Sequence, residues 1–319
     1  MANEKLKNLG VIKGTNHFTG AAMEFIVPNS TQVIFVGDLF ADEYSGGAEL
    51  TSEAIITKSP YRVHKVHSRS LTPEMVERNK DKYFIISNFV MADPTSLSIL
   101  SRGGYRYSVI EFDYKYCSFR SEKLHRLQAN VDQCWCPLQP HGVLVEELFN
   151  NAEKIFWMSE AQKSHTCSRL PTLLFADQDK HVVLSSVFQD SHIDKLLEIS
   201  ASRNPQDKLW AIQGSSNWIK GTDETMQYAK TNNMYYYLIG NMSYDQFLTE
   251  LSKCHGLIFH PLDFDTCPRV VIEAKIMGLN LDLNENVQHK DETWFNGSIE
   301  QCVQYLRSRG EHFWNNIKV

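Results

Sequence analysis

Short apolar runs alternate with helix-periodic stretches along most of this chain. The runs are rich in Val, Ile, Phe and Tyr and have the length of single buried strands. The stretches between them repeat apolar residues with the period of an amphipathic helix. This alternation predicts an α/β fold of parallel sheets with right-handed crossovers. The expected strands are 31–37, 62–67, 83–87, 107–112, 154–159, 181–186, 209–213, 234–239 and 256–259, and the expected helices are 50–56, 73–80, 94–102, 193–201, 222–230, 244–254, 270–277 and 298–317.

A polar stretch around residues 164–179 divides the chain into two such alternations. We therefore expect one domain over residues 31–165 and a second over 166–297, with the strand 181–186 as its first. A chain of 319 residues is long enough for two domains. Residues 1–30 have only short apolar pieces, and we interpret them as an N-terminal extension that could contain a hairpin.

Residues near the end of the second alternation combine strand, loop and helix signals with two carboxylates. The apolar run Gly256–Phe259 is followed by the polar turn Pro261–Pro268 and then by the helix-periodic Val270–Met277. Asp265 lies in the loop at the carboxyl end of the strand, and Glu273 lies in the first turn of the helix. Ligands of open α/β sheets bind at this edge, where helix N-termini offer N–H groups to anions. Phosphate would meet backbone donors here, and sugar hydroxyls would meet carboxylates.

This stretch resembles the acid-x7-acid signature of glycosyltransferase family 4, a family of retaining enzymes with the GT-B fold. The matching positions are Pro261, Asp265, Glu273, Ala274 and Gly278. The chain departs from the signature in two ways: the first acid is Asp rather than Glu, and the Gly-Phe-Gly core is replaced. The alternative interpretation is an ordinary strand-loop-helix unit with two solvated carboxylates.

The resemblance implies two Rossmann-like domains that face each other across a cleft. Residues 31–165 would form the acceptor side and residues 166–297 the nucleotide-sugar donor side. The C-terminal segment 298–319 would form a helix that packs back on the first domain. The resemblance covers most of residues 31–319 as a pattern, whereas only the 254–278 stretch and one Gly-Gly loop carry specific motif content.

The resemblance also implies roles for the motif residues. Glu273 would accept hydrogen bonds from the two ribose hydroxyls, since one carboxylate can bind two neighbouring hydroxyls. Asp265 would contact hydroxyls of the transferred sugar, and the backbone N–H of Cys267 would help to hold the sugar or phosphate. Arg269 could neutralise charge that develops on the diphosphate leaving group. The alternative for Arg269 is a cation that extends along a domain edge.

Two βα turns are further candidates for donor binding. Gly46 and Gly47 follow the first strand, and the Gly-Gly-Ala-Glu sequence resembles a family 4 loop at the cleft floor beside the donor diphosphate. Asn241 and Met242 follow the strand 234–239 and match a family segment whose backbone contacts the nucleotide base. Each could instead be a simple connection between a strand and a helix.

The chain lacks one family feature that binds phosphate. Family members carry a Gly-Arg after the first strand of the second domain and a Lys-Gly soon after it, and both cations clamp the diphosphate. Residues 184–192 contain neither Arg nor Lys, and Lys195 is the first cation after them. Arg269 and Lys220 are therefore the candidates to replace that pair.

Composition limits the function classes. A net charge of −6 and an isoelectric point near 6.1 argue against a broadly basic nucleic-acid surface. No apolar run approaches the ~18 residues of a membrane span, and the N-terminus has no apolar signal core. The 7 cysteines form no disulfide framework, which indicates a reducing compartment. We therefore expect a cytoplasmic protein.

Metal and hydrolase chemistry find little support in the sequence. Cys134 and Cys136, with His125 and His141, could suggest zinc, but Cys-x-Cys is not the usual ligand spacing. We therefore expect no metal site. The chain also has no Gly-x-Ser-x-Gly elbow and no Walker sequence.

These observations lead to one main functional hypothesis and two alternatives. The main hypothesis is a retaining glycosyltransferase that moves a sugar from a UDP- or GDP-sugar to an acceptor hydroxyl, on a glycan by family base rate. Its mechanism requires no metal and no cofactor, because the nucleotide sugar is itself the donor substrate. The first alternative, implied by the resemblance to compact GT-B enzymes of viral type, is transfer of a sugar to a hydroxymethylated base in DNA. The basic residues Lys58, Arg62, Lys65 and Arg69 cluster in the sequence, although they could form an ordinary solvated face. The second is a non-catalytic nucleotide-sugar-binding scaffold.

Overall fold

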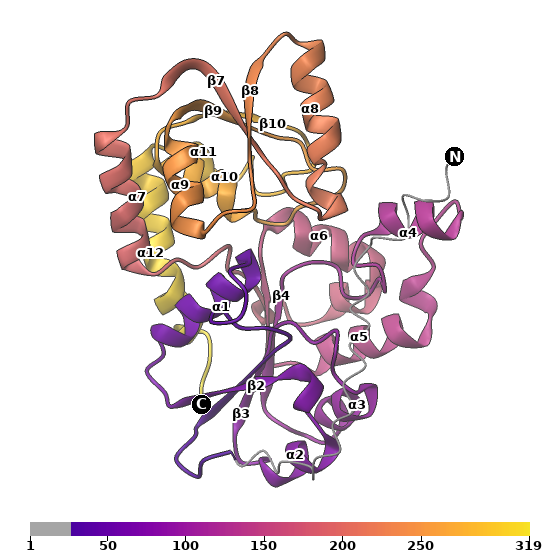
Figure 1. The fold of residues 1–319 in the computed structure, drawn as a ribbon. Coiled ribbons are helices and arrows are strands. Elements are labelled where there is room, and N and C mark those ends of the chain that lie inside the picture. Colours follow the sequence, from indigo (N-terminus) through magenta and orange to yellow (C-terminus); the bar gives the residue numbers. More distant parts are fainter. Residues whose placement is uncertain (1–26) are drawn as a thin grey trace, which may run out of the picture.

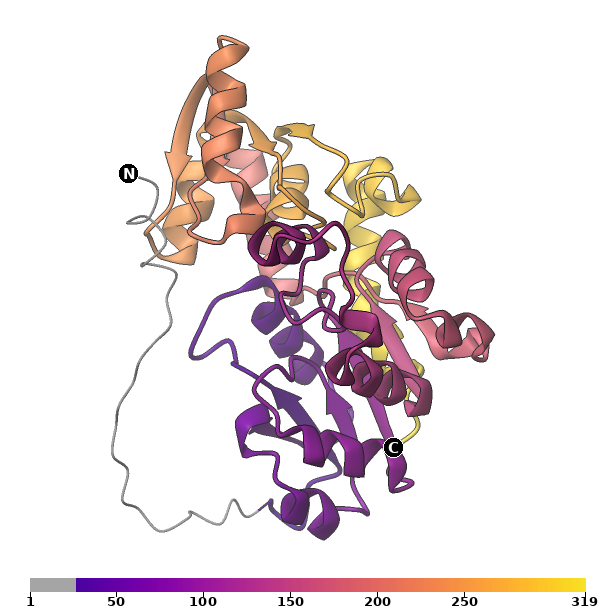
Figure 2. The same cartoon turned by 90° about the vertical axis from the view of Figure 1, so that its right-hand side faces the viewer.

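Two α/β halves make up the molecule, each with a parallel sheet at its centre (Figure 1). The computed structural model describes residues 27–319, so the extension expected for residues 1–30 lies almost entirely outside the described residues. The two halves remain one above the other when the molecule is turned by 90° (Figure 2). The α/β class and the two Rossmann-like halves expected from the sequence are confirmed.

The first half is built on a 6-stranded sheet in the order β2-β1-β3-β4-β5-β6. Alternate side chains of one strand enter two different hydrophobic clusters: Val33 and Phe35 pack on one face, and Ile34 and Val36 pack on the other. Because both faces are covered, the central strands are continuous apolar runs. The strands are β1 (Val33–Gly37), β2 (Val63–His67), β3 (Tyr83–Ile86), β4 (Tyr107–Glu111), β5 (Lys154–Trp157) and β6 (His181–Val183).

The helices of the first half begin at recognisable caps. Thr72 and Asp93 accept hydrogen bonds from backbone N–H groups at the starts of α2 and α3, and each is followed by a proline. Helices α4, α5 and α6 were not predicted, and α4 has no buried residue. The helices are α1 (Gly47–Thr57), α2 (Pro73–Arg78), α3 (Pro94–Arg102), α4 (Glu122–Ala129), α5 (Pro140–Asn151) and α6 (Glu160–Arg169).

Strand β6 differs from the expectation. We expected residues 181–186 to be the first strand of the second domain, but β6 pairs in parallel with β5 and places His181 opposite Ile155. Helix α6 makes the crossover between these two strands, and β6 completes the edge of the first sheet. The expected boundary between residues 165 and 166 therefore falls inside a β5-α6-β6 unit. An apolar run predicts a buried strand but not the sheet to which it belongs.

The second half is built on a 4-stranded parallel sheet in the order β10-β9-β7-β8. Strand β10 was not predicted, because its Asn-Leu-Asp-Leu sequence is short and half polar. The strands are β7 (Gln206–Gln213), β8 (Tyr235–Ile239), β9 (Cys254–Phe259) and β10 (Asn280–Leu283), and the helices are α7 (Asp190–Ser202), α8 (Thr222–Thr231), α9 (Tyr244–Ser252), α10 (Arg269–Ile276) and α11 (Thr293–Asn296). Within residues 27–319, no helix has the length and apolar character needed to cross a membrane.

The C-terminal helix α12 (Ile299–Asn315) returns from the second half to the first, as expected (Figure 1). Near its end, Trp314 donates an indole hydrogen bond of 2.9 Å to the Ile55 carbonyl of α1. The neighbouring Phe313 packs against Phe156 of β5, with ring centroids 4.3 Å apart. Helix α12 thus ties the second half to the sheet of the first.

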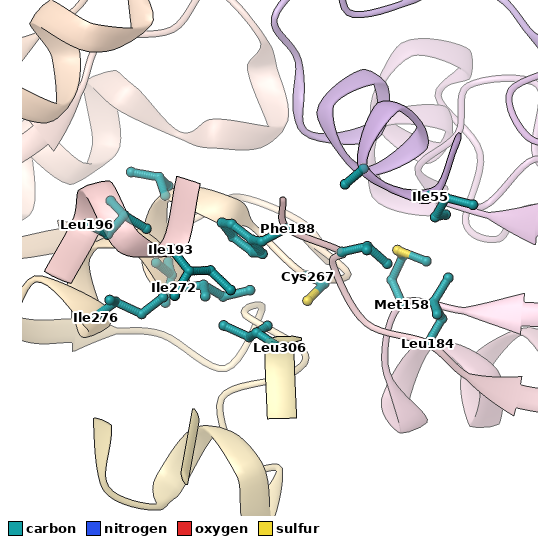
Figure 3. Close-up of a cluster of buried hydrophobic side chains, with 14 of the residues drawn as sticks. Ile55, Met158, Leu184, Phe188, Ile193, Leu196, Cys267, Ile272, Ile276 and Leu306 are labelled. Atoms are coloured by element: carbon teal, nitrogen blue, oxygen red, sulfur yellow. The ribbon is translucent and has the colours of Figure 1, made fainter. Parts of the chain in front are cut away.

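One hydrophobic cluster extends across the boundary between the halves (Figure 3). It includes Ile55 of α1, Met158 at the end of β5, Phe188 in the crossing segment, Ile272 of α10 and Leu306 of α12. All five side chains are buried. The two halves therefore share part of their core and are not separate units joined only by a linker.

Candidate active site

A cleft of about 540 Å³ lies between the two halves and is lined by residues from both. The first half contributes the turn before α1, and the second contributes the carboxyl ends of β7, β8 and β9 with the start of α10. All candidate residues from the sequence line this one cleft. They are Gly46, Gly47, Lys220, Asn241, Met242, Asp265, Cys267, Arg269 and Glu273.

Glu273 lies in the second turn of α10 rather than the expected first, because the helix already begins at Arg269, and it is almost fully buried, with 2% of its surface exposed. Its Oε1 accepts a short hydrogen bond from the Tyr244 hydroxyl and lies 3.6 Å from Nε of Arg269. Burial raises the pKa of Glu273 above its ordinary value, and the Arg269 guanidinium opposes that shift. The carboxylate is thus fixed in place and faces the cleft.

Arg269 is the first residue of α10 and contacts both halves. Its guanidinium stacks over the Phe188 ring at 3.6 Å and donates to the Val187 carbonyl at 2.7 Å. It also reaches Thr51 of α1 at 3.5 Å. At Gly47, an added Cβ would lie 3.6 Å from the Arg269 side chain. The guanidinium therefore fills the space where the N-termini of α1 and α10 meet.

Asp265, in the loop between β9 and α10, forms an ion pair with Lys220. The Lys220 ammonium lies 2.5 Å from an oxygen of Asp265, and both side chains are partly exposed. The backbone of Asp265 is held on both sides, since its N–H donates to Asn286 and its carbonyl accepts from Gln288. This short strand-like contact fixes the first acid of the signature at the cleft wall.

Cys267 interacts through its backbone carbonyl, and its thiol is not reactive. Its carbonyl accepts a hydrogen bond of 2.9 Å from the Ser186 hydroxyl. Burial raises the pKa of the Cys267 thiol to about 12, so the sulfur is not an activated nucleophile.

The loops after β7 and β8 lie close together at the cleft. An added Cβ at Gly240 would lie 2.8 Å from the carbonyl of Gly214, which excludes a larger residue there. Asn241 has a left-handed backbone with φ of 56°, and Met242 follows it at the cleft wall. The tight turn presents main-chain groups to the cleft.

Two neighbours of Glu273 were missed by the sequence analysis. Tyr244 is the first residue of α9, and its hydroxyl lies 2.5 Å from Nε2 of His192. Burial lowers the pKa of His192 to about 4, helped by the nearby positive charges of Arg269 and Lys195. His192 is therefore neutral at pH 7. A tyrosine at a helix start and a histidine on another helix carry no motif, so no sequence signal could pair them with Glu273.

The charged side chains of the cleft are arranged as opposite pairs. The pairs are Lys220 with Asp265 at 2.5 Å, Arg269 with Glu273 at 3.6 Å and Arg120 with Asp113 at 2.5 Å. Helices α1 and α10 begin at the cleft, and neither is capped by the side chain of its N-cap residue. Helix starts can offer N–H groups to an anion, although at α1 the Glu49 carboxylate lies beside Gly46 at the same end. The cleft thus offers backbone donors and paired cations to a phosphate, and carboxylates to hydroxyls.

Comparison with solved structures shows the fold. Anabaena Alr3699/HepE in complex with UDP and glucose is 12% identical, over 89% of this chain and 98% of its own, with a TM-score of 0.50. The catalytic domain of starch synthase IV from Arabidopsis thaliana is 8% identical, over 90% and 94%, with a TM-score of 0.53. The OtsA apo structure is 8% identical, over 91% and 100%, with a TM-score of 0.58. No protein-family model matches the sequence, and no curated protein does. The chain has the GT-B fold.

Proposed function

We propose that this protein is a retaining glycosyltransferase that transfers a sugar from a UDP- or GDP-sugar to an acceptor hydroxyl. The observation that carries the proposal is the cleft itself, which is lined by a buried carboxylate, Glu273, and by the N-termini of two helices. HepE, which is similar in fold, was solved with UDP and glucose. That complex favours UDP as the first nucleotide to test.

The donor would span the cleft from the second half to the first. The ribose hydroxyls would bind the second carboxylate oxygen of Glu273, since Oε1 is engaged by Tyr244. The diphosphate would lie between the N-termini of α1 and α10, next to Arg269. The transferred sugar would contact Asp265 at the opposite wall.

Transfer in such a site needs little acid–base chemistry from side chains. The bond between the anomeric carbon and the diphosphate breaks, and a new bond forms from the acceptor oxygen on the same face of the sugar. The acceptor proton passes to the departing phosphate oxygen. The protein contributes position and electrostatic stabilisation of the leaving group, through Arg269, Lys220 and the helix N-termini.

The acceptor that we propose is a glycan hydroxyl, and no observation favours DNA. Two of the basic residues that suggested DNA are engaged by carboxylates. Lys58 lies 3.1 Å from Asp190, and Lys65 lies 2.5 Å from Glu53. These pairs neutralise much of the expected basic patch and weaken its attraction for phosphate.

The activity test is the release of nucleoside diphosphate from UDP- and GDP-sugars, with NMR of the product anomer. Glu273→Gln keeps the shape but removes the charge, and we expect release to slow by about a hundredfold or more. The matched control is Glu224→Gln, at an exposed position on α8, which should keep wild-type rates. Retained configuration supports the proposal. Absence of turnover with any sugar, despite donor binding, would favour the non-catalytic scaffold.

A further inference from the structure

Four potential metal ligands gather outside the cleft, in the segment that connects β4 to α5. They are the sulfurs of Cys117, Cys134 and Cys136 and the Nδ1 atom of His125, and these atoms all lie within 4.8 Å of one another. All three cysteine residues are buried, and His125 is half-buried on α4. The proposed glycosyl transfer makes no use of this cluster.

The distances within the cluster match a tetrahedral centre. The Cys117 and Cys134 sulfurs are 3.7 Å apart. His125 Nδ1 lies 3.1 Å from the Cys134 sulfur, 3.4 Å from that of Cys136 and 3.9 Å from that of Cys117. A tetrahedral zinc ion with bonds of ~2.3 Å to sulfur and ~2.05 Å to nitrogen requires separations of about 3.8 Å between sulfurs and about 3.5 Å between sulfur and nitrogen. A disulfide would instead bring two sulfurs to ~2.05 Å.

Groups around the cluster are arranged to support thiolate ligands. The Ser118 hydroxyl lies 3.4 Å from the Cys136 sulfur, within hydrogen-bond distance. The His125 ring stacks on Phe119, with centroids 4.7 Å apart and planes at 11°. Such outer contacts hold metal ligands in their orientation.

We propose that Cys117, His125, Cys134 and Cys136 bind one zinc ion. Three cysteines and one histidine are a known ligand set of structural zinc sites, and four protein ligands leave no open position for catalysis. From the sequence we expected no metal, because Cys-x-Cys is not the usual ligand spacing and His141 was grouped with His125, Cys134 and Cys136. The Nε2 atom of His141 is instead 2.6 Å from the Lys115 carbonyl, and Cys117 completes the set.

The metal would stabilise helix α4, which has no buried side chain of its own. Helix α4 spans Glu122–Ala129 and has no buried residue, and a helix this short is marginal by itself. The same segment reaches the second half. Ser121 donates to Asp263 at 2.5 Å, and the Lys123 ammonium donates to the Leu262 carbonyl at 2.7 Å. The zinc site would thus support one edge of the loop that precedes Asp265.

The test begins with the wild-type full-length chain, purified without chelator. Native mass spectrometry and metal analysis should find about one zinc per chain, retained through dialysis. Replacement of the zinc by Co²⁺ should give the intense visible d–d bands of a tetrahedral site, together with sulfur-to-cobalt charge transfer in the near ultraviolet. Chain that binds no zinc, or that carries iron or a disulfide at these cysteines, would overturn the proposal.

Variants assign the ligands. Cys134→Ser should lower bound zinc at least about tenfold and remove the charge-transfer band, since one thiolate is lost. The matched control is Cys254→Ser, because Cys254 is equally buried but lies in β9 outside the cluster. It should keep the full zinc content. If Cys134→Ser and Cys254→Ser bind zinc equally well, the assignment is wrong. None of these readouts depends on glycosyl transfer, so they separate this proposal from the proposed function.

Discussion

The fold buries Glu273 in a place where its charged form is less favourable than in water. Its carboxylate is almost fully removed from water and is held by Tyr244 and Arg269. A charged group in such a place persists only with partners. The same partners leave it facing the cleft, where ribose hydroxyls can bind it. Burial that is unfavourable for the free protein is therefore consistent with a binding role.

We expect donor affinity to weaken at acidic pH through Glu273. Because burial raises its pKa above 4.5, the side chain takes up a proton at a higher pH than an ordinary glutamate and then loses its charge as an acceptor. Calorimetric dissociation constants for the preferred donor should rise as the pH falls toward this pKa. Glu273→Gln should bind weakly at every pH without this dependence. Equal pH profiles for the two proteins would show that another group is responsible.

His289 makes a separate prediction about stability. Burial lowers its pKa to about 3, whereas an unfolded histidine titrates near ~6.5. Between these values the unfolded chain binds a proton that the folded chain does not, so stability is lost as the pH falls through this window. His289→Leu should reduce the difference in unfolding free energy between pH 7 and pH 4 by about 3 kcal/mol, measured by urea unfolding.

The control for this prediction is His255→Leu. His255 is half-buried and accepts a hydrogen bond of 2.9 Å from Asn280. His289, in contrast, has no hydrogen-bond partner for either ring nitrogen among the described residues. The control should keep the wild-type pH dependence. An unchanged acid loss in His289→Leu would mean that His289 does not titrate in this way.

Residues of the candidate site were predictable where a local motif contained them. Asp265 and Glu273 belong to one loop and helix, so their spacing could be recognised in the sequence. Tyr244 could not be found in that way, because it meets Glu273 and His192 only through packing of distant segments. The expectation of no metal site did not consider Cys117, which precedes α4 in the sequence, whereas Cys134 and Cys136 follow it.

At the scale of elements, helix α12 acts as a brace between the halves. Trp314 is 5% exposed and anchors the end of this helix to α1 through its bond to Ile55. Trp314→Ala should lower the free energy of unfolding by about 3–5 kcal/mol, through the lost burial and the cavity that remains. Chemical denaturation measures this change.

Phe175→Ala is the matched control, because the Phe175 side chain is 89% exposed. It should change stability by less than about 0.5 kcal/mol. A loss in Trp314→Ala no larger than in this control would mean that α12 does not brace the fold.

Elements were predictable in proportion to their apolar periodicity. The buried strands β1, β3 and β4 were recognisable because both of their faces are covered. Helix α4 and strand β10 were not recognisable. Polar side chains dominate α4, and two of the four residues of β10 are polar. The sheet that β6 joins is determined by tertiary packing and cannot be predicted from the composition of the strand.

At the scale of the whole molecule, the shared core predicts cooperative behaviour. One hydrophobic cluster contains Phe35 of the first sheet, Leu257 of the second and Leu306 of α12. Unfolding of one half would expose apolar surface on the other. We expect one thermal transition, with coincident midpoints from calorimetry, far-ultraviolet circular dichroism and tryptophan fluorescence. Two resolved transitions would show that the halves are energetically separate.

The central claim is that the cleft binds a nucleotide sugar, and calorimetry with UDP-, GDP-, ADP- and dTDP-sugars tests it most directly. We expect one nucleotide class to bind to the wild type and to lose at least about tenfold in affinity in Glu273→Ala, which removes the ribose acceptor. Failure of every nucleotide sugar to bind at millimolar concentration, or binding that Glu273→Ala leaves unchanged, would contradict the account.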